Sequence, residues 1–118
     1  MRREELYLTD IIEAADAIQN FLQGKQRSHF LGNDLVRSAV LQKLLIIGEA
    51  AARLPKEFRE RHSEIPWVDI VAFRNIAVHA YFSVDWAIVW TAATKDAPEL
   101  GQVVAEILAN EYSEGTSL

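Results

Sequence analysis

Hydrophobic residues recur along this chain at the three- and four-residue spacing of amphipathic helices. Residues 4–22 carry such a stripe on one side, from Leu8 to Leu22. A loop is predicted over 26–32, after which Asn33 or Asp34 can cap a second helix that runs to Leu54. No strand alternation competes with these patterns, so the chain is predicted to be all-α, an antiparallel four- to five-helix bundle.

Prolines and capping residues divide the second half of the chain. Pro55 ends the second helix, and 56–62 can form a short exposed helical turn. Pro66 suits the first turn of a helix to about residue 80, Ser83 can cap a helix over 84–94, and Asp96 can start a last helix to about residue 110. Residues 1–112 are therefore predicted to be a single helical domain, and 113–118 a flexible tail.

The second predicted helix is apolar almost all round between residues 44 and 52. A helix of that kind can pack in its own bundle on one side and against another chain on the other. We therefore expect the bundle to form a homodimer.

Polar side chains interrupt the apolar segment 65–82 at Asp69 and at a quartet near its end, Arg74, Asn75, His79 and Tyr81. Such a segment is expected to be buried, where an unpartnered polar group costs roughly 2–7 kcal/mol. On a helix, Asn75 and His79 share one face, while Arg74 and Tyr81 share the adjoining one. All four could border a single cleft.

An Arg and a His beside one cleft can cleave RNA through its own 2′-hydroxyl. The guanidinium of Arg74 matches phosphate oxygens, and His79 can give or take a proton. This route needs no metal and no cofactor. Because one His cannot be acid and base at once, a twofold axis that brings two copies of Arg74 and His79 together would complete the site.

The same residues also allow a purely structural explanation. Arg74 and His79 could be satisfied core residues, paired to Glu49 or Asp69. Glu49 lies in an apolar stretch and is the expected counter-ion of Arg74, although a role as an ordinary surface glutamate stays open. The Arg-x4-His spacing alone does not decide between a site and a buried pair.

Composition and charge narrow the class of protein. Half of the 118 residues are apolar, there is no cysteine, and no apolar run is long enough to span a membrane, so a cytoplasmic protein without membrane contact is expected. The net charge is −5, with the basic residues concentrated before residue 75. A polyanion would have to be met by Arg74 and by the cluster of Arg53, Lys56, Arg59 and Arg61, which could equally be a solvated helix face.

The order of motifs resembles that of one family. Arg74-Asn75-x3-His79-x-Tyr81 closes a helix begun by Ile65-Pro66-Trp67, after Ile47-Gly48-Glu49-Ala50-Ala51 and before Val84-Asp85 and Asp96-Ala97-Pro98-Glu99-Leu100. Over residues 4–110 these are similar to HepT-like toxins of the HEPN superfamily, small helical proteins of prokaryotic toxin–antitoxin pairs.

The resemblance implies a homodimeric, metal-independent endoribonuclease, the toxin of a type VII-like toxin–antitoxin pair. Its catalytic residues at the dimer cleft match Arg74 and His79, and Asn75 matches the polar position beside the Arg. It implies that a minimal nucleotidyltransferase, acting as antitoxin, transfers AMP to Tyr81. The acidic C-terminal half fits RNA poorly, which leaves open a non-catalytic subunit that binds a nucleotide or the partner enzyme, or an inert bundle.

Overall fold

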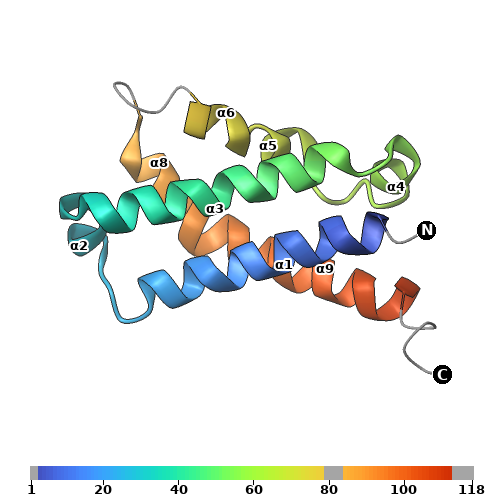
Figure 1. Ribbon diagram of the computed structural model, residues 1–118, viewed down its shortest axis with the longest axis horizontal. Coiled ribbons are helices and arrows are strands. Elements are labelled where there is room, and N and C mark those ends of the chain that lie inside the picture. Colours follow the sequence, from blue (N-terminus) through green and yellow to red (C-terminus); the bar gives the residue numbers. More distant parts are fainter. Residues whose placement is uncertain (1–2, 79–83, 113–118) are drawn as a thin grey trace.

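The computed structural model describes residues 3–78 and 84–112, and within these ranges all regular structure is helical (Figure 1). Three long helices run along the molecule, α1 (Arg3–Leu22), α3 (Asp34–Arg53) and α9 (Ala97–Tyr112). The α1 helix packs against both α3 and α9. Its stripe from Leu8 to Leu22 is buried as predicted, against residues such as Leu44 and Val104. The all-α prediction is confirmed.

The predicted loop over 26–32 is wrong, because residues Arg27–Gly32 form the short helix α2. Phe30 explains the difference, since it is fully buried with its ring 5.3 Å from that of Trp90. A tertiary anchor of this kind stabilises a turn of helix that local spacing does not reveal. The predicted cap of the next helix is confirmed, because the Asn33 side-chain oxygen accepts the Val36 N–H at 3.0 Å.

Pro55 ends α3 as predicted, and α4 (Lys56–Arg61) is the expected short turn. The single helix predicted from Pro66 is instead two, α5 (Trp67–Val71) and α6 (Phe73–Val78), separated at Ala72. At this interruption the Asn75 N–H bonds to the Ala72 carbonyl, only three residues back, at 2.9 Å. Both short helices lie against α3 (Figure 1).

The break predicted at Asp96 is also wrong. Residues 86–112 are one helical run, made of α8 (Trp86–Thr91), a π-helical turn η1 (Ala92–Asp96) and α9. Within η1 the Ala97 N–H bonds to the Ala92 carbonyl, five residues back. The wider turn accommodates Pro98, which has no N–H to donate. Asp85 caps α8, accepting the Ala87 N–H at 3.0 Å; the predicted cap, Ser83, lies outside the described residues, as does the predicted tail.

The apolar middle of α3 is covered mostly by its own chain. Leu44, Ile47, Ala50 and Ala51 are buried, with α1, α5 and α6 packed around the helix. The pattern over 44–52 is therefore explained without a second subunit, and the homodimer stays a prediction. None of the described helices is long and apolar enough to cross a membrane.

Candidate functional site

Arg74 and Glu49 meet where α6 crosses α3, and Gly48 makes this crossing possible. A Cβ atom on Gly48 would lie 2.7 Å from the Arg74 backbone nitrogen and 3.2 Å from the Val71 carbonyl oxygen. Real Cβ atoms essentially never come within 3.0 Å of another heavy atom in this way, so only glycine lets the two backbones approach this closely. The packing sets the next residue of α3, Glu49, beside Arg74.

Glu49 lies between two arginines, and we call Glu49, Arg53 and Arg74 the Glu49 triad. Its Oε1 is 3.5 Å from Nη1 of Arg74, and its Oε2 is 3.9 Å from Nη2 of Arg53, one turn further along α3. Glu49 is thus the counter-ion of Arg74, as expected. Asp69, the alternative partner, is exposed on α5 and lines a groove with Pro66.

The triad is open to solvent. Ile70 and Phe73 of the apolar segment are buried as expected, but the expectation that Arg74 and Asn75 are buried with them is wrong. The side chains of Arg74, Glu49 and Arg53 are 41%, 44% and 63% exposed, and Asn75 is exposed. No polar or charged residue among those described is buried. Arg74 therefore escapes the large desolvation penalty of a buried charge and can be reached by a ligand.

His79 and Tyr81 lie outside the described residues. Val78 is the last described residue before them, so the structure relates Arg74 to Glu49 but does not test the predicted grouping of all four polar residues.

The basic cluster predicted to meet a polyanion is divided. Arg61 donates to Glu111 at 2.9 Å, and Lys56 lies 3.9 Å from Glu60. Arg59 lines a groove between α4 and α5 with Trp67 and Val68. Only Arg53 joins Arg74. The sequence did not predict this difference between Arg53 and the other basic residues, nor the close packing at Gly48. The only signal of that packing in the sequence was a glycine inside an apolar helix.

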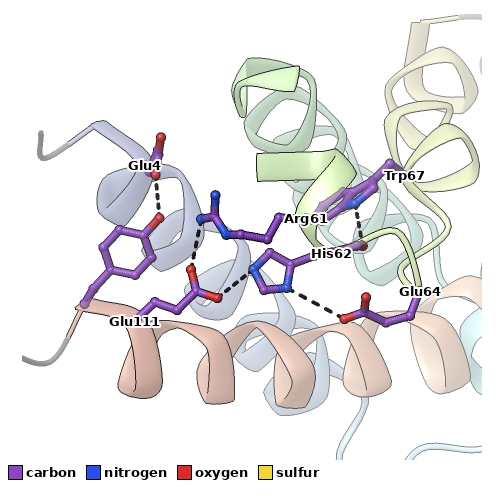
Figure 2. Close-up of polar contacts among 7 residues, drawn as sticks. Glu4, Arg61, His62, Glu64, Trp67 and Glu111 are labelled. Carbon is purple, nitrogen blue, oxygen red and sulfur yellow. Dashed lines mark hydrogen bonds and ion pairs between the residues drawn. The ribbon is translucent and has the colours of Figure 1, made fainter. Parts of the chain in front are cut away.

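A second polar group, which we call the terminal cluster, contains Glu4, Arg61, His62, Glu111 and Tyr112 (Figure 2). The Glu111 carboxylate accepts from Arg61 at 2.9 Å and lies 2.8 Å from Nε2 of His62, although this second approach is not aligned as an N–H···O hydrogen bond. The Tyr112 hydroxyl donates to Glu4. The cluster joins the ends of α1, α4 and α9.

Ionisation in the terminal cluster follows from its contacts. Burial, together with the hydrogen bond to Glu4, raises the pKa of Tyr112 to about 12. The hydrogen bond to Glu111 raises the pKa of the Arg61 guanidinium. Tyr112 and Arg61 are therefore protonated at neutral pH, as their contacts with Glu4 and Glu111 require. The contacts of the cluster connect the ends of three helices.

Comparison with known proteins gives the class. The sequence profile of the family described as "Ribonuclease HepT-like" matches residues 11–107. A relative from Caldanaerobacter subterraneus, named as a candidate RNase, is 37% identical over 94% of this chain and 99% of its own length. Another from Thermococcus cleftensis, named as a probable ribonuclease HepT, is 37% identical over 84% of this chain and 90% of its own.

A third relative, from Methanocaldococcus jannaschii and also named as a candidate RNase, is 34% identical over 87% of this chain and 94% of its own. No solved structure shows significant similarity. The chain belongs to the HepT-like ribonuclease family. The predicted family and the predicted class, a toxin-type endoribonuclease, are thereby confirmed.

Proposed function

We propose that this chain is the toxin of a type VII-like toxin–antitoxin pair, a metal-independent endoribonuclease whose active site lies at a homodimer cleft. The observation that supports this best is the state of Arg74, a half-exposed guanidinium held only loosely, 3.5 Å from Glu49. It stands in an Arg-x4-His sequence ahead of His79. A guanidinium that is charged and lies at the surface is available to bind a phosphate.

In the proposed reaction, RNA supplies the nucleophile. Arg74 binds the non-bridging oxygens of the scissile phosphate and stabilises the charge that develops on them. One His79 takes the proton of the 2′-hydroxyl, whose oxygen attacks phosphorus, and the leaving 5′-oxygen receives a proton from the His79 of the second chain. The products are a 2′,3′-cyclic phosphate and a 5′-hydroxyl. Asn75, which is exposed next to Arg74, would contact the same strand.

The homodimer is proposed because each chain carries one His79. Exposed apolar side chains offer surface for self-association, among them Leu35 on α3 (79% exposed) and Ile88 on α8 (59% exposed). Sedimentation at micromolar concentration is expected to give a dimer. A monomer that still cleaves RNA at full rate would contradict the shared site.

The proposed control is AMP transfer to Tyr81 by a cognate minimal nucleotidyltransferase, the antitoxin. Tyr81 follows Arg74 by seven residues, and an added phosphodiester would bring negative charge and bulk near a phosphate-binding Arg. Co-expression with the partner is expected to add the mass of one AMP group per chain. Tyr81→Phe should show no addition and stay active beside the antitoxin.

The decisive experiment for the activity is His79→Ala, measured by cleavage of single-stranded RNA. Loss of a general acid–base residue lowers such rates about 10²- to 10⁴-fold. Wild-type cleavage should persist in the presence of a metal chelator and should leave 2′,3′-cyclic phosphate ends. Arg27→Ala on α2 is the control, and it should fold and cleave RNA as the wild type does. Equal toxicity of His79→Ala and wild type would remove the acid–base role.

A wild type that binds nucleotide or the partner without cutting RNA would instead support a non-catalytic binding subunit.

A further inference from the structure

We infer that Arg53 is a second phosphate-binding residue of this site, and that Glu49 is the positioning residue that holds the two guanidiniums side by side. This inference rests on the proposed function and extends it from the scissile phosphate to a neighbouring one. Nothing in the Arg-x4-His motif points to Arg53, which lies 21 residues earlier on a different helix.

The charge balance of the triad carries the inference. One carboxylate faces two guanidiniums, so the triad keeps a net positive charge at the surface of an otherwise acidic chain. Its two contacts, 3.5 and 3.9 Å, are longer than charge-assisted hydrogen bonds, which measure about 2.7–2.9 Å. Donors of both arginines therefore remain free to bind an anion.

A helix pair with Glu four residues before Arg is common and stabilises a helix only slightly. That explanation covers the contact between Glu49 and Arg53 but leaves out Arg74, which approaches the same carboxylate from α6. Gly48 fixes that approach through its contact with the Arg74 backbone. Arg53 from α3 and Arg74 from α6 therefore lie beside the same carboxylate, that of Glu49.

The rest of the basic cluster is engaged elsewhere or faces another groove. Arg61 is held in the terminal cluster, and Lys56 lies on α4 beside Glu60, whereas Arg53 lies beside Glu49, the acid that Arg74 also contacts. Arg53 is 63% exposed and is the last residue of α3. It is therefore the cation of that cluster best placed to extend the surface that Arg74 begins. A strand of RNA with one phosphate on Arg74 would set an adjacent phosphate toward Arg53.

The test measures binding apart from cleavage, with a fluorescent single-stranded oligonucleotide made non-cleavable by 2′-O-methyl groups. Arg53→Ala is expected to raise Kd about three- to tenfold and to lower the slope of log K against log salt by about 0.7, the value for one phosphate on a single strand. Arg53→Lys should keep most of the salt slope. Arg27→Ala, an exposed arginine on α2, is the matched control and should behave as wild type.

The outcomes separate the two proposals. Wild-type Kd and salt slope in Arg53→Ala would overturn the role of Arg53, whether or not RNA is cut. An oligonucleotide that binds through Arg53 while unmodified RNA is left intact would support the inference and overturn the nuclease. Failure of the wild type to bind the oligonucleotide would overturn both. In cleavage assays, Arg53→Ala should raise KM with kcat nearly unchanged.

Discussion

The two polar groups of this molecule use the same residue types in opposite ways. In the terminal cluster, Glu111 lies 2.9 Å from Arg61 and 2.8 Å from His62, and His62 is only 12% exposed. In the Glu49 triad, the contacts are 3.5 and 3.9 Å and every side chain is more than 40% exposed. The contacts of the first group are short and include the largely shielded His62, although its Arg61 is itself 49% exposed; the contacts of the second group are longer and lie entirely among exposed side chains.

The difference separates stabilisation from binding. Short, partly shielded pairs contribute to stability because they are less screened and well fixed, whereas exposed long pairs contribute about 0–1 kcal/mol. The terminal cluster joins three helices that are far apart in the sequence. The contacts of the triad therefore add little to the free energy of unfolding, and its net positive charge remains available to a ligand. Four substitutions or conditions test this contrast.

The largest effect is expected from Gly48→Ala. The new methyl group would meet the Arg74 nitrogen at 2.7 Å, so α6 must move away from α3. We expect a loss of about 1–3 kcal/mol in unfolding free energy despite the better helix propensity of Ala, together with loss of RNA cleavage. Urea unfolding measures the first. Gly32→Ala, which has open space around it, should be neutral, and equal stability of the two variants would contradict the tight crossing.

Glu49→Gln comes next. Removing the carboxylate frees both arginines, so RNA should bind at least as tightly, while kcat should fall about tenfold because Arg74 loses its positioning partner. Unfolding free energy should stay within about 0.5 kcal/mol of wild type. Glu57→Gln, at an exposed position on α4, controls for the charge change. A kcat equal to wild type would remove Glu49 from the site.

In the terminal cluster, Glu111→Gln should lower the unfolding free energy, since Arg61 loses a charged acceptor and the 12%-exposed His62 loses the carboxylate that lies 2.8 Å away. RNA cleavage below the melting temperature should not change. Glu64→Gln removes a longer, 3.7 Å contact to the same imidazole from an exposed residue, and should have almost no effect. If cleavage fell with Glu111→Gln, the two groups would not be independent.

The smallest effect is a loss of stability in alkali. Because the folded state raises the pKa of Tyr112 from 10.0 to about 12, its contribution is complete below pH 10 and is lost as pH rises through 12. Melting temperature should therefore fall over that window. Tyr112→Phe should lose part of this dependence, and an unchanged pH profile in that variant would contradict the hydrogen bond to Glu4.

The sequence allowed several features of the fold, and one contact of the triad, to be predicted where local signals were strong, but it gave no sign of the terminal cluster. The stripe of α1, the cap at Asn33 and the pairing of Glu49 with Arg74 follow from periodicity and from an acid in an apolar stretch. Helix α2 depends on the burial of Phe30 against distant parts of the chain, and the continuous helix through Pro98 depends on a π-helical turn. Neither has a local pattern in the sequence.

The exposure of the site could not be read from composition. The segment around Arg74 is apolar enough to suggest burial. The interruption at Ala72 and the close backbone contact at Gly48 instead bring Arg74 beside Glu49 at the surface. Arg53 looked like one of four equivalent basic residues. Its distinction comes only from the three-dimensional approach of α6 to α3.

The most direct test of the central claim is Arg74→Ala, with RNA cleavage and melting temperature measured on the same preparation. If Arg74 serves a ligand, cleavage should fall about 10²- to 10³-fold while unfolding free energy changes by less than about 0.5 kcal/mol. A large drop in melting temperature with cleavage preserved below it would show that Arg74 holds the fold, and would contradict this account.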